Sequence, residues 1–494
     1  MSRSITIYNS LSREKETFKP IVEGRIGMYV CGPTVYNDVH LGNCRTFTSF
    51  DIIYRYLLYA GFKVRYVRNI TDVGHLLDNG EDRMAKGARL EQLEPMEVSQ
   101  KYTNGFHEMM KIFNNLSPSI EPRATGHIIE QIKMTEDILS RGFAYLKNGS
   151  VYFDTPKFIK EGYPYGQLSG RIVEELVAES RDNLKNQDEK NHPADFALWI
   201  KASEEHIMRW ESPWSIGFPG WHLECSAMST KYLGETFDIH GGGNDLKFPH
   251  HENEIAQSMG SCGHPPANYW LHTNMLLLNG KKMSKSDGNT ISPQELFSGN
   301  SEHISKAYSP MAIKFFMLQA HYRSPLDITD EALQAAEKGY KRLMDAFNLV
   351  TNLNPDLPAS GVRDQEILSI IDQSLMYMDD DFNVPNALAS LFELATMINS
   401  FNDGHIKLNE IGLDVWRNMK NHFKVLISDV FGLQDEHSIE DGSTTNGLMN
   451  LIIDLRKDIR ERKDWASADK IRDSLLALGI QLKDGKDGTS WKKN

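Results

Sequence analysis

Hydrophobic and polar positions near the N-terminus predict a strand, a turn, a helix and a second strand. Residues 26–31 are nearly all apolar, as in a buried strand. Apolar side chains then recur at helical spacing between Phe47 and Leu58, and Gly61 can end that helix. Residues 64–70 alternate as a second strand. A strand–helix–strand unit favours a parallel sheet, in which ligands bind at the carboxyl ends of the strands.

Later segments predict further parts of the chain. Residues 120–200 have the character of an insertion, and its charged run, 174–190, is typical of a solvated loop. Residues 80–120 are charged and helical in character, and strand-like sequence returns at 194–199 and 237–240.

From about residue 305 the pattern becomes helical. Apolar positions follow helical spacing over 312–318, 332–350, 367–378 and 388–401. Polar residues 436–446 predict a domain boundary without regular structure. Residues 447–494 predict helices with a local excess of Lys and Arg, among which Trp465 and Trp491 offer stacking faces. This composition fits RNA contact; the alternative is a salt-bridged helical pair, because acids are interleaved.

Composition narrows the class of protein. The 494 residues favour two to four domains, and the net charge of -13 argues against a uniformly basic nucleic-acid binder while permitting a local basic patch. Neither a bilayer-spanning stretch nor a signal-peptide core is visible in the sequence. Four widely spaced cysteines do not form a secreted disulfide framework, so we expect a cytoplasmic protein that uses cysteine to bind metal.

One set of soft ligands suits zinc. His250 and Glu254 are four residues apart, so on a helix they share one face. Such a pair alone is more often an exposed helix start. Cys31 follows an apolar run, and Cys225 follows the unusual stretch Trp221-His222-Leu223-Glu224. Two thiolates, one imidazole and one carboxylate would suit Zn²⁺ if the fold brings them together.

Two other segments are suited to phosphate. His40-Leu41-Gly42-Asn43 precedes the first predicted helix, where unpaired amides and the helix dipole favour an anion; the alternative is a helix cap made by Asn43. Residues 281–289 form a short lysine-rich loop, which can place ammonium groups on phosphates or can simply be solvated.

The glycine run 241–243 after His240 predicts close approach of a ligand to the backbone. A hydrolase oxyanion hole is the alternative, but no G-x-S-x-G accompanies it, and neither a Walker A motif nor G-x-G-x-x-G is present.

These segments resemble a known family. His40-Leu41-Gly42-Asn43 and Lys282-Met283-Ser284-Lys285-Ser286 resemble the HIGH and KMSKS signatures of class I aminoacyl-tRNA synthetases. Residues 28–36, 68–72, 219–228 and 238–254 resemble the cysteinyl-tRNA synthetases more narrowly, and the similarity runs nearly end to end. Asn43 departs from the family, where His is usual. An amide keeps an N–H donor but cannot carry a proton, so phosphate contact is expected to survive.

The resemblance implies a fold and a division into domains. We expect an α/β fold: a Rossmann-like parallel-sheet catalytic domain over 1–304, with an insertion at about 120–200 and the KMSKS loop at 282–286. An α-helical bundle over 305–435 and a small C-terminal anticodon-binding, and therefore RNA-binding, module over 447–494 follow.

The resemblance also implies the chemistry. ATP with Mg²⁺ lies between the signatures, His40, Asn43, Lys282 and Lys285 donate to its phosphates, and the products are cysteinyl-adenylate and then cysteinyl-tRNA(Cys). Zinc is held by Cys31, Cys225, His250 and Glu254, and it selects the thiolate of L-cysteine, because shape alone separates near-isosteres by only about 10². Thr71 and Trp221 are expected to contact the cysteine, with His222, His240 and His251 around the site. We expect a monomer.

Two alternative functions share some of these features. A ligase that joins cysteine to an amino sugar through the same adenylate would share the zinc and both signatures, but the C-terminal module argues against it. A zinc-stabilised RNA-binding protein without activity would lack a use for the two ATP signatures.

Overall fold

The structure is a computed structural model that describes residues 3–73, 93–171, 189–283, 288–353, 360–436, 443–462, 464–485 and 488–493. It contains two compact units, Met1–Leu433 and Gln434–Asn494, which are described separately. Within the described residues, no helix has the length and apolar character needed to cross a bilayer.

A parallel four-stranded sheet forms the centre of the first unit. Its order is β10 (Ala267–Thr273), β9 (Phe237–Gly243), β3 (Arg25–Val30) and β4 (Lys63–Arg68), and every neighbouring pair is parallel. Helix α1 (Leu41–Tyr59) connects β3 to β4, and α8 (His250–Ser261) lies between β9 and β10. The predicted parallel-sheet fold is confirmed.

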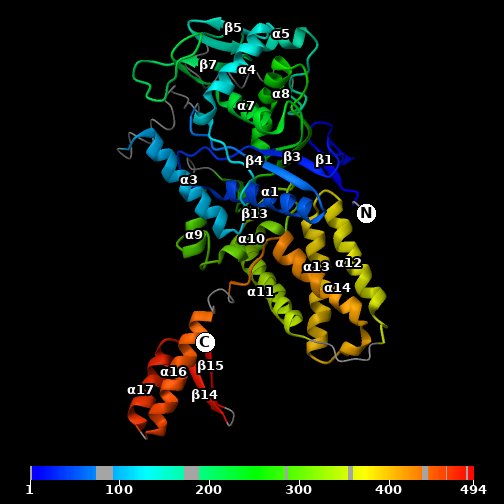
Figure 1. The fold of residues 1–494 in the computed structure, drawn as a ribbon, viewed down its shortest axis with the longest axis vertical. Helices are drawn as coiled ribbons and strands as arrows, with labels where there is room; N and C mark the ends of the chain where they lie inside the picture. The colour runs from blue at the N-terminus through cyan, green and yellow to red at the C-terminus, as the bar shows by residue number, and fades with distance from the viewer. Residues whose placement is uncertain are drawn as a thin grey trace. The chain divides into compact units, whose positions relative to one another are not determined.

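The alternation of β3 divides its side chains between two cores. Met28 and Val30 pack with α1, whereas Tyr29 and the following Cys31 pack in the core that contains Cys225. Figure 1 shows α7 (Trp221–Leu233) and α8 on one side of the sheet and α1 with α10 (Pro310–Leu318) on the other. Cys31 therefore lies on the side of α7 and α8.

The insertion contains its own antiparallel sheet, in the order β5 (Ala144–Lys147), β6 (Ser150–Phe153), β7 (Phe196–Lys201) and β8 (Gly217–Pro219). Helices α4 (Ile128–Ser140) and α5 (Thr155–Lys160) belong to the same region, and α3 (Pro95–Ile112) precedes it. Because β8 completes this sheet, the region extends past residue 200. The predicted solvated loop, 174–190, lies outside the described residues except for its last two positions.

Short strands flank the main sheet. A hairpin of β1 (Thr6–Asn9) and β2 (Glu14–Thr17) lies beside β10, where Ser10 N–H donates to the Trp270 carbonyl at 2.8 Å. A second small sheet pairs β12 (Lys281–Lys282), β11 (Leu276–Leu278) and β13 (Leu326–Ile328), and α9 (Pro293–Ser298) follows β12. The lysine loop therefore starts from β12.

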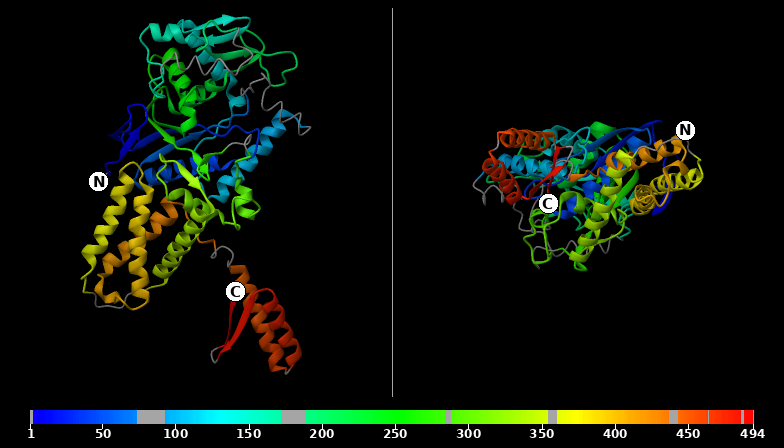
Figure 2. Two further views of the ribbon diagram at one scale, coloured as in Figure 1. Left: turned by 180° about the vertical axis from the view of Figure 1, so that it is seen from behind. Right: turned by 90° about the horizontal axis from the view of Figure 1, so that it is seen from below.

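The predicted helical region after residue 305 is confirmed. Helices α11 (Asp330–Asn352), α12 (Asp364–Asp379), α13 (Val384–Asn402) and α14 (Leu413–Lys424) pack side by side, and a π-helical segment, Val425–Val430, extends α14. The left view of Figure 2 shows α11 to α14 together. Their apolar faces join one core with α1 and α10.

The second unit contains α16 (Ser443–Glu461), α17 (Trp465–Ala477) and the hairpin of β14 (Ile480–Gly485) with β15 (Gly488–Lys493). The predicted helices are present in this unit. The prediction that 436–446 lacks regular structure was wrong in part, because α16 begins at Ser443. The unit also contains a hairpin that was not predicted, in which Leu482 pairs with Trp491. Among its basic residues, Arg456 is buried and donates to the Ala468 carbonyl, and Arg472 pairs with Asp469 at 2.9 Å.

Candidate functional site

The four predicted metal ligands meet on one side of the sheet, and all are buried. Cys31 follows β3, Cys225 lies in α7, and His250 and Glu254 lie one turn apart in α8. One ligand atom from each lies within 4.8 Å of the others. The i,i+4 spacing in α8 and the alternation of β3 explain why these residues converge.

The separations between ligand atoms fit a tetrahedral ion. Cys31 Sγ lies 3.6 Å from Cys225 Sγ and 3.5 Å from Glu254 Oε1. His250 Nε2 lies 3.4 Å from Cys225 Sγ and 3.2 Å from Glu254 Oε1. Tetrahedral Zn²⁺, with bonds of about 2.3 Å to sulfur and about 2.0 Å to nitrogen or oxygen, requires edges of about 3.8 Å for S···S, about 3.5 Å for S···N or S···O, and about 3.3 Å for N···O. The residues present fit zinc.

Two further histidines support this set. His240 Nε2 lies 2.8 Å from Glu254 Oε2, on the carboxylate oxygen that faces away from the other ligands. His222 Nδ1 lies 3.0 Å from His250 Nδ1, which leaves His250 Nε2 toward Cys225. Such outer contacts orient metal ligands and tune their basicity.

A chain of buried contacts leads away from Cys31. His251 Nε2 lies 3.3 Å from Cys31 Sγ, its Nδ1 lies 2.8 Å from His272 Nε2, and His272 Nδ1 lies 2.9 Å from Ser10 Oγ. Sequence reasoning missed His272 and Ser10. A histidine at the carboxyl end of the apolar strand β10 was the available signal for His272; Ser10 had none, because its contact depends on the β1 hairpin lying beside β10.

Burial dominates the electrostatics of the cluster. It raises the pKa of the Cys225 thiol to about 12 and that of Cys31 well above its usual range. It also lowers the pKa of His222 to about 3 and that of His251 well below its usual range, so both rings are neutral at pH 7. A bound cation would reverse the preference of the thiols for the protonated form.

The two predicted cysteine-binding residues lie beside this cluster. The ring of Trp221, the first residue of α7, has its centroid 4.5 Å from that of His250. Thr71 is buried; its hydroxyl donates to Glu224 and accepts a 3.0 Å hydrogen bond from Asn69 Nδ2. Burial raises the pKa of Glu224 well above its usual range. Sequence reasoning did not select Glu224, which precedes Cys225 in α7.

The first signature forms the start of α1. His40 is the N-cap, and Asn43 is the third helical residue. His40 Nδ1 accepts from the Asn43 backbone N–H at 3.2 Å, and Asn43 Oδ1 accepts from the His40 backbone N–H at 3.5 Å. The alternative prediction of a cap made by Asn43 is confirmed in part: His40 occupies the N-cap position, and the Asn43 side chain completes a capping box with it. The amide NH₂ of Asn43 stays outside this capping box.

The second signature is described only in part. Lys282 is exposed at the end of β12, and its carbonyl accepts from Asn289 Nδ2 at 3.1 Å. Lys285 lies outside the described residues.

The glycine run has a use that was not predicted. A Cβ on Gly241 would come within 2.3 Å of the Phe50 ring of α1, and one on Gly242 within 2.9 Å of Leu246 and 3.0 Å of His251. At these two positions the missing side chains make room for the protein's own packing. The expectation that they also let a ligand approach the backbone stays a prediction.

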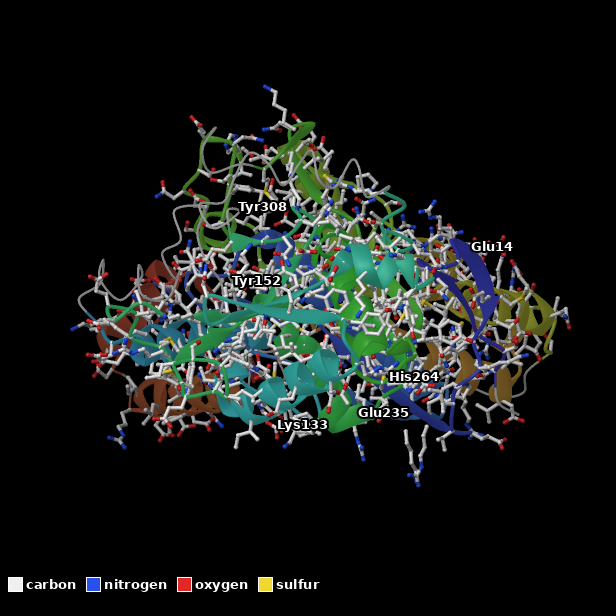
Figure 3. The ribbon with its side chains drawn as sticks, turned by 90° about the horizontal axis from the view of Figure 1, so that it is seen from above. Glu14, Lys133, Tyr152, Glu235, His264 and Tyr308 are labelled. Carbon is white, nitrogen blue, oxygen red and sulfur yellow. The ribbon has the colours of Figure 1, made fainter. Side chains whose placement is uncertain are left out.

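A second possible set, Cys31, His240, His251 and Glu254, shares two residues with the first, and a third set lies apart from this cluster. Glu235, Cys262 and His264 are exposed or half-buried, with His264 Nε2 3.2 Å from Glu235 Oε2. Figure 3 shows Glu235 and His264 next to each other. His264 Nδ1 lies 3.0 Å from the Thr236 hydroxyl, so this set is a hydrogen-bonded cluster at the surface.

Comparison with known proteins identifies the family. The model for the class I (C) tRNA synthetase catalytic domain matches residues 17–338, and that for the DALR domain matches residues 376–434. Cysteine–tRNA ligase from Bacteroides fragilis is 51% identical over 100% of both chains. The cysteine–tRNA ligase from Cytophaga hutchinsonii is 49% identical over 99% of each chain, and that from Deinococcus radiodurans is 46% identical over 99% of this chain and 97% of its own.

Solved structures agree on the fold. Mycobacterium tuberculosis methionyl-tRNA synthetase in complex with methionyl-adenylate matches with a TM-score of 0.59 at 14% identity, over 83% of this chain and 92% of its own. The leucyl-tRNA synthetase in a ternary complex from Agrobacterium radiobacter matches with a TM-score of 0.58 at 12% identity, over 84% and 85%. The full-length identity and the matching catalytic domain establish that the chain belongs to the cysteine–tRNA ligase family.

Proposed function

We propose that this enzyme ligates L-cysteine to tRNA(Cys) through a cysteinyl-adenylate, with Zn²⁺ held by Cys31, Cys225, His250 and Glu254. The observation that carries the proposal is the buried ligand set, whose separations of 3.2–3.6 Å match tetrahedral zinc. Family membership supports the ligation itself.

Adenylate formation depends on neutralising phosphate charge. The cysteine carboxylate attacks the α-phosphate of ATP and displaces pyrophosphate, and Mg²⁺ would supply further positive charge to the phosphates. His40 accepts a hydrogen bond at Nδ1, so its neutral ring carries the proton on Nε2, where it can donate to phosphate. Asn43 offers its amide NH₂, and the amino end of α1 adds backbone donors. Lys282 and Lys285 supply ammonium groups. Loss of one such donor typically costs about 10²–10³ in rate.

Selection of cysteine over serine needs more than shape. Bound zinc would supply a soft Lewis acid that prefers thiolate to hydroxyl. The chain's own residues hold its ligands: His240 fixes the Glu254 carboxylate, and His222 fixes the His250 ring. Trp221 beside His250 would cover the substrate side chain.

Thr71 would contact the cysteine as an acceptor. Its only proton is given to Glu224, so the hydroxyl can offer a lone pair but no donor. An ammonium group is the matching partner on an amino acid.

The domain roles follow the same proposal. Residues 1–304 perform adenylate chemistry, 305–435 form the helical bundle, and 447–494 contact the anticodon. Relatives named cysteine–tRNA ligase match 99–100% of this chain, including its C-terminal part. This match favours tRNA over an amino sugar as the acceptor.

Cysteine-dependent ATP–pyrophosphate exchange tests the proposal. We expect exchange with cysteine, little exchange with serine, and loss of exchange in Cys225→Ser, followed by cysteinylation of a tRNA(Cys) transcript. Cys262→Ser is the matched control, because Cys262 lies outside the buried cluster. Zinc-loaded protein without any exchange would contradict the proposal.

A further inference from the structure

Three cations gather beside the candidate site without being part of it. Arg13 lies in the turn between β1 and β2, Arg171 lies in the loop at 164–171 of the insertion, and Lys247 ends the short 3-10 helix Asn244–Lys247. We call these three residues the Arg13 patch. Arg13 and Arg171 line one shallow, open surface depression of about 520 Å³.

Local packing fixes this arrangement. Gly170 has φ +74°, and a Cβ there would come within 2.1 Å of Arg13 Nη2, so the glycine lets the guanidinium lie against the loop. The guanidinium carbon of Arg171 lies 5.2 Å from the centre of the Phe248 ring, which adjoins Lys247.

The loop itself is tied to α8. Glu252 accepts from the backbone N–H groups of Gly166 at 2.8 Å and Ser169 at 3.0 Å, and Tyr165 donates to Asn253 at 2.6 Å. The Glu252 carboxylate therefore holds the backbone of this loop against α8.

The patch lies next to the carboxyl ends of the strands in the parallel sheet. The 3-10 helix that contains Lys247 begins where β9 ends, and His250 follows three residues later. The ATP signature starts α1, which packs on the opposite face of the sheet from α8. The cations of the patch belong to elements on the α8 side, whereas the proposed ATP donors His40 and Asn43 lie at the start of α1.

We propose that the Arg13 patch binds backbone phosphates of the single-stranded 3′ end of tRNA as that end enters the site. Single-stranded RNA is bound by basic grooves that contain aromatic side chains, and here the Arg171 guanidinium lies over the ring of Phe248. The inference rests on the proposed function and names the surface that receives the acceptor. Burial lowers the pKa of Lys247, and Arg13 and Arg323 lower it further, as expected of cations gathered together. Arg323, which pairs with Asp381 at 2.6 Å, is not part of the patch.

Charge reversal tests the patch in the full, zinc-loaded chain. For Arg13→Glu and Arg171→Glu we expect kcat/KM for a tRNA(Cys) transcript to fall about tenfold each at low salt. The slope of log kcat/KM against log salt should become shallower by about 0.7 for each phosphate that the variant no longer binds. ATP–pyrophosphate exchange, which needs no tRNA, should stay within about twofold.

Lys133→Glu is the matched control, because it makes the same change of charge at an exposed site on α4 (Figure 3). Equal losses in Lys133→Glu would overturn the inference, as would a parallel loss of pyrophosphate exchange, which would assign the patch to ATP.

If a reversal variant does not fold, Arg13→Gln and Arg171→Gln should lower kcat/KM about threefold and leave exchange unchanged; no loss would overturn the inference. Absence of exchange in the unsubstituted chain would instead contradict the proposed function.

Discussion

The side chain of Asn43 has two roles, one for its amide oxygen and one for its amide NH₂. Its Oδ1 accepts from the His40 N–H and completes the capping box of α1, while its NH₂ is the group proposed for phosphate. The usual histidine of the family could serve the second task with a positive charge. An amide serves it with a neutral donor, so the substitution changes electrostatics more than geometry.

Asn43→Asp separates these tasks. The variant keeps the capping oxygen, and its carboxylate is attracted to the positive amino end of α1. We therefore expect an unchanged or higher melting temperature. It replaces the donor with a carboxylate that repels phosphate, so we expect ATP–pyrophosphate exchange to fall by about 10² or more. Asn402→Asp, at an exposed position in α13, is the control. Exchange that survives in Asn43→Asp would remove Asn43 from the phosphate site.

At the scale of elements, Arg45 joins the segments that carry the two ATP signatures. It lies in α1, is buried, and its guanidinium donates to three backbone carbonyls, those of Met275 at 2.9 Å, His321 at 3.3 Å and Ser324. Met275 directly precedes β11, which pairs with β12 and so with the start of the lysine loop. The guanidinium group of Arg45 therefore holds α1 at a fixed distance from that small sheet.

Arg45→Lys should loosen this connection. A lysine keeps the charge but cannot reach three carbonyls in the plane of a guanidinium. We expect kcat for pyrophosphate exchange to fall about tenfold, while KM for cysteine and the zinc content remain within about twofold, because the cysteine site lies on the other face of the sheet. Equal changes in the kinetics of both substrates would indicate general destabilisation instead.

Lys314 connects α10 to α1 and to the end of α3. Its Nζ is fully buried and donates to the Phe113 carbonyl at 2.7 Å and to Asn115 Oδ1 at 3.3 Å, with Asp51 at 3.6 Å. Burial lowers the pKa of Lys314 from 10.5 to about 8. Between these two values the unfolded chain binds more protons than the folded chain, so stability should rise with pH; below about pH 8 both states are protonated and this contribution is constant.

Urea unfolding of Lys314→Met checks this sign. The variant loses the hydrogen bonds and is expected to be less stable at every pH. Between pH 8 and 9.5 the unsubstituted protein should gain stability relative to the variant by about 1.5 kcal/mol, from the shift of Lys314 alone. A constant difference across this range would mean that the pKa of Lys314 is not lowered.

These examples show what the sequence could and could not predict. Local periodicity was sufficient for the parallel sheet, for the pairing of His250 with Glu254, and for the start of α1. The partners that join distant elements were not predictable, because they depend on tertiary packing. Ser10 reaches His272 only because the β1 hairpin lies beside β10, and Gly241 is required by Phe50 from another element.

At the scale of the whole molecule, the chain separates into a unit with the candidate site and a unit that shares none of its residues. Gln434–Asn494 forms its own contacts among α16, α17 and the β14–β15 hairpin. Of its predicted RNA-binding residues, Arg456 is used internally, whereas Trp465 is 56% exposed. The basic character of the module thus serves partly its own packing, and the exposed tryptophan is the better candidate for stacking on a base.

Truncation of the chain after Leu433 should therefore affect adenylate formation and transfer of cysteine to tRNA differently. The remaining unit keeps every described residue of the candidate site, so we expect ATP–pyrophosphate exchange within about twofold of that of the full chain. Cysteinylation of a tRNA(Cys) transcript should lose about 10² in kcat/KM, and Trp465→Ala in the full chain should lose about tenfold, since stacking of one base is worth about 1–3 kcal/mol. Trp214→Ala, which removes a tryptophan of the insertion, controls for general effects on folding. If the shortened chain charged tRNA at the full rate, the C-terminal unit would have no part in tRNA recognition, and the surface of the first unit, including the Arg13 patch, would have to account for all of it.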